Sequence, residues 1–245
     1  MERNISTDAV VIANTRSGER NREISLFSPD YGVMRVLVYG GQKSHKASCP
    51  PLFSIGKFFL TSNPLRNSYS FNDVKYIPLC PFDFTLKQIG IASFICELGK
   101  EVGESDHIST YRLISTALIL LSASSDLIRE NSILIQFVWQ LMKSAGLVSD
   151  LNRCPVCGTE YSGTQVLFYS NAVNFFCCQR CTEERALFIG PGAQRYLSLT
   201  LEMELLDAVE VPLNEATANR LRRLMIAYSM NVCGRKLKTV QSGLV

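Results

Sequence analysis

Five cysteines within one short segment are the residues best suited to chemistry. Cys154 and Cys157 flank Pro-Val and precede Gly158, while Cys178 and Cys181 flank Gln-Arg. Two thiolates separated by two residues can bind one metal ion from a tight turn, and two such pairs in this order are typical of four-cysteine zinc sites. We therefore predict that Cys154, Cys157, Cys178 and Cys181 bind Zn²⁺. Four sulfur ligands leave no position for water, so the predicted zinc is structural and not catalytic.

The fifth cysteine of the segment, Cys177, is an alternative to its neighbour Cys178. We predict that Cys178 is the ligand because it keeps the two-residue gap to Cys181, which leaves Cys177 as a buried neighbour or a reserve ligand. The alternative interpretation of the whole cluster is a set of free or buried thiols. The nine cysteines are an odd number and no signal peptide is expected, which argues against a disulfide framework.

A glycine-rich loop at 39–46 (YGGQKSHK) has some features of a nucleotide-binding P-loop. A P-loop needs glycines at two positions that this chain fills with Leu37 and Gln42, so we do not expect ATP binding. The loop carries two lysines, one histidine and no acid. It is therefore either a solvated hairpin loop or a segment that binds nucleic-acid phosphates.

Residues suited to catalysis are scarce. The two histidines, His45 and His107, lie outside any metal or triad motif. The chain also lacks H-E-x-x-H, G-x-S-x-G and dinucleotide-binding glycine motifs. We expect a protein that is not an enzyme and has no small-molecule substrate.

Charge and hydropathy narrow the class of protein. Net charge over the 245 residues is +3, but residues 1–80 balance to +4, residues 81–219 to −7 and residues 220–245 to +6. Two basic ends can form a surface for a polyanion, or they can simply keep the protein soluble. The apolar stretches are too short to span a membrane, and we expect a soluble, cytoplasmic protein with no membrane partner.

The first 80 residues predict β-structure. Alternating or β-branched segments at 8–15, 23–27, 33–39, 52–61 and 69–77 are separated by turn residues. Five short strands with one long loop after the third suit an OB-fold-like barrel, although an SH3-like barrel or an open sandwich has the same number of strands.

Helical periodicity begins after residue 80. Apolar residues at helical spacing predict helices at 84–99, 107–123, 126–145, 182–199 (interrupted at 190–192), 201–209 and 214–232. We expect Phe137 and Trp139 to belong to the core. The predicted class is α+β and multidomain, with a five-stranded OB-fold-like barrel at 1–79 and an all-helical domain at 80–150 and 185–245. A four-cysteine zinc finger at 151–184 is inserted into that helical domain.

Two motifs carry a family resemblance. One is the entry to the cysteine cluster, Asn152-Arg153-Cys154-Pro-Val-Cys157-Gly158, and the other is the basic ending Gly234-Arg235-Lys236-Leu237-Lys238. Together with the glycine-rich loop and the order of barrel, helices and cysteine insert, they resemble the RecO family of bacterial recombination mediators. The resemblance extends over most of the chain.

The resemblance implies a non-enzymatic DNA-binding protein of recombinational DNA repair, cytoplasmic and associated with the nucleoid. RecO-like proteins bind single- and double-stranded DNA and anneal complementary strands. They act with RecR to help load RecA onto single-stranded DNA coated with SSB, and they contact the acidic C-terminal tail of SSB.

Basic residues are the candidates for these contacts. For DNA phosphates we predict residues of the barrel and of the basic ending: Arg35, Lys43, Lys46, Lys57, Arg66, Arg235, Lys236 and Lys238. For the acidic tail we predict Arg222 and Arg223 on the last long helix, where Arg can rim an apolar groove. Tyr39, Phe58 and Tyr69 are possible base-stacking residues, although Phe58 suits the barrel core better. Each charge can instead be an ordinary solvated side chain.

Two other classes of protein compete with this interpretation. A zinc-stabilised scaffold for protein interactions, without a direct DNA role, would bind DNA weakly and a protein partner tightly. A zinc-dependent hydrolase would need an open metal position, which a fourth cysteine ligand excludes.

Overall fold

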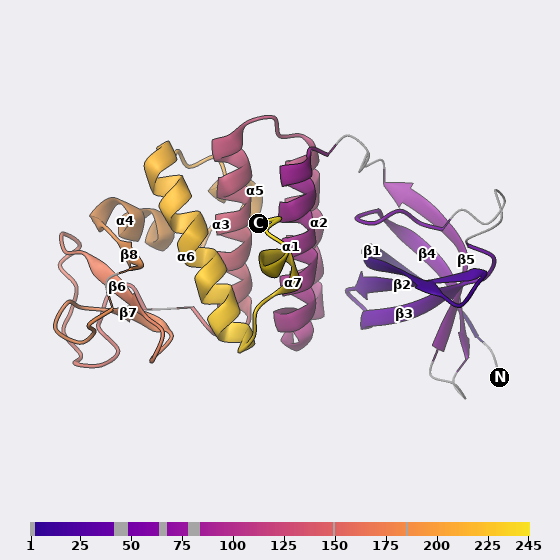
Figure 1. Ribbon diagram of the computed structural model, residues 1–245, viewed down its shortest axis with the longest axis horizontal. Coiled ribbons are helices and arrows are strands. Elements are labelled where there is room, and N and C mark those ends of the chain that lie inside the picture. The colour runs from indigo at the N-terminus through magenta and orange to yellow at the C-terminus, as the bar shows by residue number, and fades with distance from the viewer. Residues whose placement is uncertain (1–2, 42–48, 64–67, 78–83, 149, 185) are drawn as a thin grey trace. The chain divides into compact units, whose positions relative to one another are not determined.

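The computed structural model describes residues 3–41, 49–63, 68–77, 84–148, 150–184 and 186–245. The chain divides into two compact units, one of residues 1–123 with 244–245 and the other of residues 124–243. The first unit contains strands β1–β5 and helices α1 and α2, and the second contains α3–α7 and β6–β8 (Figure 1). Among the described helices, none is both long and apolar enough to cross a membrane.

The first unit begins with a closed five-stranded barrel, so all five predicted strands are present. The strands are β1 (Arg3–Ser17), β2 (Asn21–Ser28), β3 (Gly32–Val38), β4 (Ile55–Asn63) and β5 (Ser68–Ile77). Their order around the barrel is β1-β2-β3-β5-β4. Only the β3–β5 pair is parallel, and it is short, joining Val36 to Tyr69 and Leu37 to Ser70.

The inward-facing side chains of the strands form the core of the barrel. In β3 the buried residues Met34, Val36 and Val38 alternate with more exposed ones, as the period of two along a strand requires. They join a core of Ala9, Val11, Ile24, Leu26, Phe58 and Leu60. Phe58 has no exposed surface, so it packs in the core and is not available for base stacking.

The fourth strand begins at Ile55, later than the predicted residue 52. Leu52 and Phe53 form a turn, and Phe53 has a left-handed backbone with φ +69°. Its N–H donates to the Val11 carbonyl and the Ser54 carbonyl accepts from Val11 N, each at 2.9 Å. The apolar residues at 52–53 therefore belong to a turn that is hydrogen-bonded to β1 and not to a strand. Strand periodicity alone does not distinguish the two.

Two helices complete the first unit. Helix α1 (Leu86–Val102) leads through a 3₁₀ turn, η2 (Gly103–Ser105), into α2 (His107–Ser122). Thr85 and Gln88 form a capping box at the start of α1, and the Asp106 side chain caps α2 by accepting from Ser109 N at 3.0 Å. Each cap satisfies backbone donors that the first turn leaves unpaired.

His107 joins α2 to the barrel within this unit. Its imidazole lies against Gly32, where a Cβ atom would be 2.6 Å from His107 Nε2. Gly32 also has φ +64°, a backbone conformation that glycine adopts readily. The ring also packs against Phe27 in a T-shaped arrangement, with ring centroids 6.1 Å apart. The predicted position of His107 in the first turn of a helix is confirmed.

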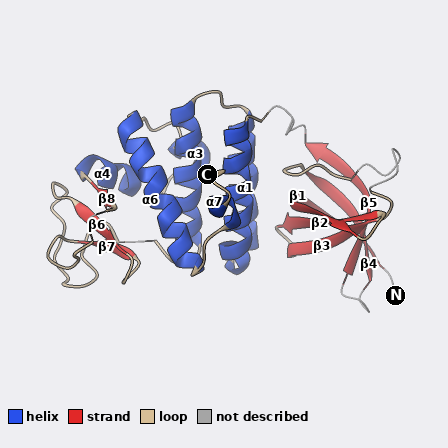
Figure 2. Cartoon of the chain, in the orientation of Figure 1, coloured by secondary structure: helices blue, strands red, loops and turns tan. Residues whose placement is uncertain are grey.

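Helix α3 (Leu127–Ser144) is the centre of the second unit, which also contains α4 (Pro191–Thr200), α5 (Leu205–Ala208), α6 (Glu215–Cys233) and α7 (Lys238–Gln241). Phe137 and Trp139 are fully buried, as predicted. Trp139 Nε1 donates to the Leu197 carbonyl at 2.9 Å, and Gln136 Nε2 donates to Thr200 Oγ1 at 2.9 Å. These bonds tie the C-terminal half of α4 to α3, and both helices are drawn in blue in Figure 2.

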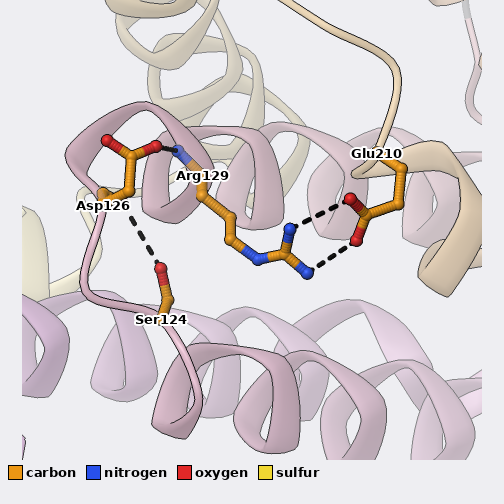
Figure 3. A network of polar contacts seen from close by, with 4 residues as sticks. All are labelled: Ser124, Asp126, Arg129 and Glu210. Carbon is orange, nitrogen blue, oxygen red and sulfur yellow. Dashed lines mark hydrogen bonds and ion pairs between the residues drawn. The ribbon is translucent and has the colours of Figure 1, made fainter.

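An ion pair secures the start of α3 (Figure 3). The Arg129 guanidinium donates to both carboxylate oxygens of Glu210, at 3.1 and 2.6 Å. Arg129 lowers the pKa of Glu210. Asp126 caps the helix by accepting from Arg129 N at 2.8 Å. The residues after α5 are thereby held beside the first turn of α3.

Two predicted helices are wrong in part. The helix expected at 182–199 begins only at Pro191, because Phe188 and Ile189 form strand β8 and pair with β6 (Leu167–Ser170). The helix expected at 201–209 is confined to α5. In both segments the apolar residues recur at helical spacing although part of their backbone is irregular or extended. Periodicity alone therefore assigned these segments wrongly.

Candidate functional site

The structure brings four cysteine sulfurs together. The Sγ atoms of Cys154, Cys157, Cys178 and Cys181 all lie within 4.8 Å of one another. Cys157 Sγ and Cys178 Sγ are 3.7 Å apart. Sulfurs around a tetrahedral zinc with bonds of about 2.3 Å are about 3.8 Å apart, so the cluster fits this ion in both ligand type and spacing.

The first pair of sulfurs comes from a tight turn. Gly158 has φ +71° and donates its N–H to the Cys154 carbonyl at 2.9 Å, and Cys154 N donates to the Thr159 carbonyl at 2.9 Å. An isolated bridge between Arg153 and Glu160 closes the base of this turn. The turn reverses the chain between Cys154 and Cys157 and points both sulfurs to one side.

The second pair follows a hairpin. Strands β6 and β7 (Phe175–Cys177) are antiparallel, and Asn174 takes φ +59° in the turn between them. Cys177 pairs with Phe168 inside the hairpin and is fully buried. Cys178 lies just beyond β7, and its sulfur is in the cluster whereas that of Cys177 is not.

Hydrogen bonds favour thiolates in the first pair. Burial opposes ionisation of Cys154, but backbone N–H groups of Cys178, Cys157 and Val156 lower its pKa to about 5. The Thr159 hydroxyl and backbone lower the pKa of Cys157. Hydrogen bonding with Cys157 and Cys178 raises the pKa of Cys181. Four neighbouring thiolates repel one another, and a divalent cation among them relieves that repulsion.

The cysteine segment is anchored to α6. Asn231 Nδ2 donates to the Tyr169 hydroxyl at 3.1 Å, and the rings of Tyr169 and Tyr228 meet with centroids 5.6 Å apart. The Arg220 guanidinium lies 4.6 Å from the centroid of the Phe188 ring on β8. Figure 1 shows β6–β8 beside α4 and α6. The cluster therefore belongs to a small sheet that packs on the helices of its unit.

Two of the predicted DNA contacts lie on the outer face of the barrel, and three lie outside the described residues. Arg35 on β3 and Lys57 on β4 are exposed. Lys43, Lys46 and Arg66 fall in segments that the structure does not describe.

Arg35 and Lys57 are not neighbours on the barrel surface. Strand register places Arg35 level with Ser68 at the start of β5, and it pairs Lys57 with Lys75. The seven residue steps along β5 from Ser68 to Lys75 correspond to about 23 Å, at about 3.3 Å per residue. The two cations mark separate points along the barrel wall.

Sequence reasoning missed the surroundings of Lys57. Lys75 is exposed directly opposite it on β5, and Asp8 is its partner on β1. Cross-strand partners point to the same face, so Lys75 points outward with Lys57. The register of β5 shifts between Phe71 and Asp73, so simple alternation along the strand was not a usable signal and only the charge of Lys75 was. Tyr39 is 61% exposed and remains open for stacking, whereas Tyr69 packs partly against the barrel core.

The basic ending is exposed in the second unit. Gly234 ends α6 with φ +63°, and the exposed residues Arg235 and Lys236 follow it. Leu237 is fully buried and anchors the segment, and Lys238 begins α7 with its side chain exposed. The three predicted cations thus lie together around one buried leucine.

The two arginines predicted for an acidic tail differ in exposure. Arg223 is exposed on α6, whereas Arg222 is half-buried and its Nε has no hydrogen-bond partner among the described residues. Burial lowers the pKa of Arg222. Consecutive residues point about 100° apart on a helix, so the two side chains leave α6 in different directions.

Two family models match this chain, one over the barrel and one over the segment that follows it. Residues 1–79 match the family model described as Recombination protein O N terminal, and residues 84–241 match Recombination protein O C terminal. A DNA repair protein RecO of Desulforamulus reducens is 25% identical over 239 residues, which cover 96% of this chain and 91% of the relative. The DNA repair protein RecO of Exiguobacterium sp. is 25% identical over 237 residues, covering 94% and 91%.

Matches over both segments define the class: this is a protein of DNA repair. Within that class the chain belongs to the RecO family, which confirms the resemblance found in its motifs.

Proposed function

We propose that this chain is a non-enzymatic DNA-binding protein of recombinational repair. It anneals complementary strands and, with RecR, helps load RecA onto single-stranded DNA coated with SSB. The observation that carries the proposal is the family match over both segments, residues 1–79 and 84–241. The closed barrel supports an OB-fold assignment, and OB-folds bind oligonucleotides. We place the protein in the cytoplasm, at the nucleoid.

The proposed DNA surface is sequence-neutral. Arg35, Lys57, Lys43, Lys46 and Arg66 contact phosphates along the barrel, and Arg235, Lys236 and Lys238 add contacts from the C-terminal segment. Binding two strands on such a surface raises their local concentration and screens their mutual repulsion. Annealing is accelerated in this way without any bond being broken.

The four cysteines hold a structural zinc in this proposal. The ion supplies a cross-link between the turn at Cys154–Cys157 and the end of the β6–β7 hairpin. With four thiolate ligands it has no open position, which agrees with a role in folding. We propose the domain boundaries 1–79, 80–150, 151–184 and 185–245, with the segment 151–184 as the zinc-binding insert.

Arg222 and Arg223 are the proposed contacts for the acidic C-terminal tail of SSB. Their support is the position of both on α6 and the exposure of Arg223. RecR is the further partner, and its contact surface is not assigned to particular residues.

Strand annealing tests the proposal directly. Two complementary oligonucleotides, one with a fluorophore and one with a quencher, are coated with SSB and mixed with and without the protein. We expect faster quenching with the protein in the absence of any nucleotide. Acceleration that requires ATP, or none at low salt, would contradict a non-enzymatic annealing protein.

A further inference from the structure

Thr159 lies between the exposed cysteine of the cluster and a cation. Its hydroxyl oxygen is 3.2 Å from Cys157 Sγ, and Arg180 Nη2 is 3.3 Å from the same oxygen. The Thr159 carbonyl also accepts a hydrogen bond of 2.9 Å from Cys154 N. One residue thus contacts both cysteines of the first pair and, through Arg180, the turn that carries the second pair.

The chemistry of the three side chains fixes the direction of these hydrogen bonds. A guanidinium can only donate, and a metal-bound thiolate can only accept. A hydroxyl has one proton and two lone pairs. When Arg180 donates to the oxygen of Thr159, the single hydroxyl proton remains available for Cys157 Sγ.

We propose that Thr159, oriented by Arg180, is a positioning residue for the metal at the four-cysteine site and slows the release of Cys157 from it. This inference rests on the proposed zinc site. Cys157 is exposed whereas Cys154 is 1% exposed, so water and competing chelators reach Cys157 first. A hydrogen bond from the Thr159 hydroxyl to the thiolate stabilises the charge of Cys157, so loss of this bond should ease the release of Cys157.

Zinc affinity and the rate of zinc transfer to a chromophoric chelator test the proposal on the full chain. Thr159→Val removes the hydroxyl and keeps the shape, while Thr159→Ser keeps the hydroxyl. Thr164→Val is the matched control, because the Thr164 hydroxyl bonds to Ser162 in the same segment, at 2.8 Å. Outer hydrogen bonds commonly change metal affinity 10–100-fold, and for this exposed one we expect about tenfold weaker binding in Thr159→Val.

A double-mutant cycle tests whether Arg180 acts through the Thr159 hydroxyl or has only a general structural role. Arg180→Gln should weaken zinc binding when Thr159 is present and should have no further effect in the Thr159→Val background, because both changes act through one hydroxyl. Arg180→Gln is a change at an exposed side chain and serves the test even where Thr159→Val folds poorly.

The outcomes distinguish this inference from the zinc site itself. Tight zinc binding by the wild type, with equal affinity in Thr159→Val and Thr164→Val, would contradict the role of the Thr159 hydroxyl. It would still support the zinc site. Additive effects of Arg180→Gln and Thr159→Val would overturn the role of Arg180 as the orienting residue. A wild-type chain that binds no zinc would overturn both proposals.

Discussion

Cys177 and Cys178 are adjacent in the chain, yet their side chains lie in different surroundings. Cys177 ends β7 as a fully buried residue, and burial together with the nearby Cys154 raises its pKa to about 11. Cys178 is half-buried with its sulfur in the four-cysteine cluster. Neighbouring residues of an extended segment point to opposite sides, which makes it hard for Cys177 to replace Cys178.

The two thiols should therefore respond differently to substitution. We expect Cys177→Ser to retain one zinc per chain with a lower melting temperature, because a hydroxyl would replace a buried thiol. Cys178→Ser should lose most of its zinc. Metal analysis of the purified variants checks both, and zinc loss in Cys177→Ser with retention in Cys178→Ser would exchange their roles.

Gly32→Ala should destabilise the first unit. An alanine there must adopt a left-handed backbone, at a cost of roughly 1–2 kcal/mol, and must also displace the His107 ring. Gly18→Ala is the control, since Gly18 has φ +66° with nothing within 4 Å of a new Cβ. Urea unfolding should show the larger loss for Gly32→Ala, and His107→Ala should reduce the difference. Equal losses would mean that the ring moves aside freely.

At the scale of residues, the sequence identified the cysteines but not what surrounds them. Ligand spacing within a turn is local information, so the two pairs were predictable. Thr159 and Arg180 are 21 residues apart and meet only because the hairpin returns the chain to the first turn. No local sequence pattern predicts this contact.

At the scale of elements, strands were predicted where one face is buried. The alternation in β3 is regular, whereas β8 has two residues and exists through its pairing with β6. Phe188 on β8 is held from outside its own segment, by Arg220 on α6. Such tertiary contacts decide short elements, and local periodicity cannot report them.

Removal of zinc should unfold the cysteine segment and leave helix α3 folded. The cross-linked turns at 154–181 have little regular structure, so we expect amides of this segment to lose exchange protection in a strong chelator. Helix α3 is held by Trp139 and Gln136 and should keep its protection. Hydrogen exchange with mass spectrometry measures the protection of both segments. Loss of protection in α3 when zinc is removed would show instead that the ion stabilises the whole unit.

At the scale of the whole molecule, charge is unevenly distributed along the chain, and folding places the two described barrel cations, Arg35 and Lys57, at separate points. Composition alone predicted basic ends, with +4 in residues 1–80 and +6 in residues 220–245. The positions of Arg35 and Lys57 on the barrel wall required the strand register, which the sequence does not give. A polyanion that follows the barrel wall can contact several such points in turn.

Fluorescence anisotropy of a labelled oligo-dT strand over a salt series tests the central claim most directly, that the barrel binds DNA through its phosphates. For the wild type we predict affinity that falls linearly with salt on logarithmic axes. Each lost phosphate contact should reduce that slope by about 0.7, so Arg35→Gln/Lys57→Gln should bind more weakly with a shallower slope. The control Lys143→Gln should match the wild type, because Lys143 is paired with Glu202 at 2.7 Å. No wild-type binding at low salt, or a slope unchanged in the double variant, would contradict a barrel-bound DNA strand.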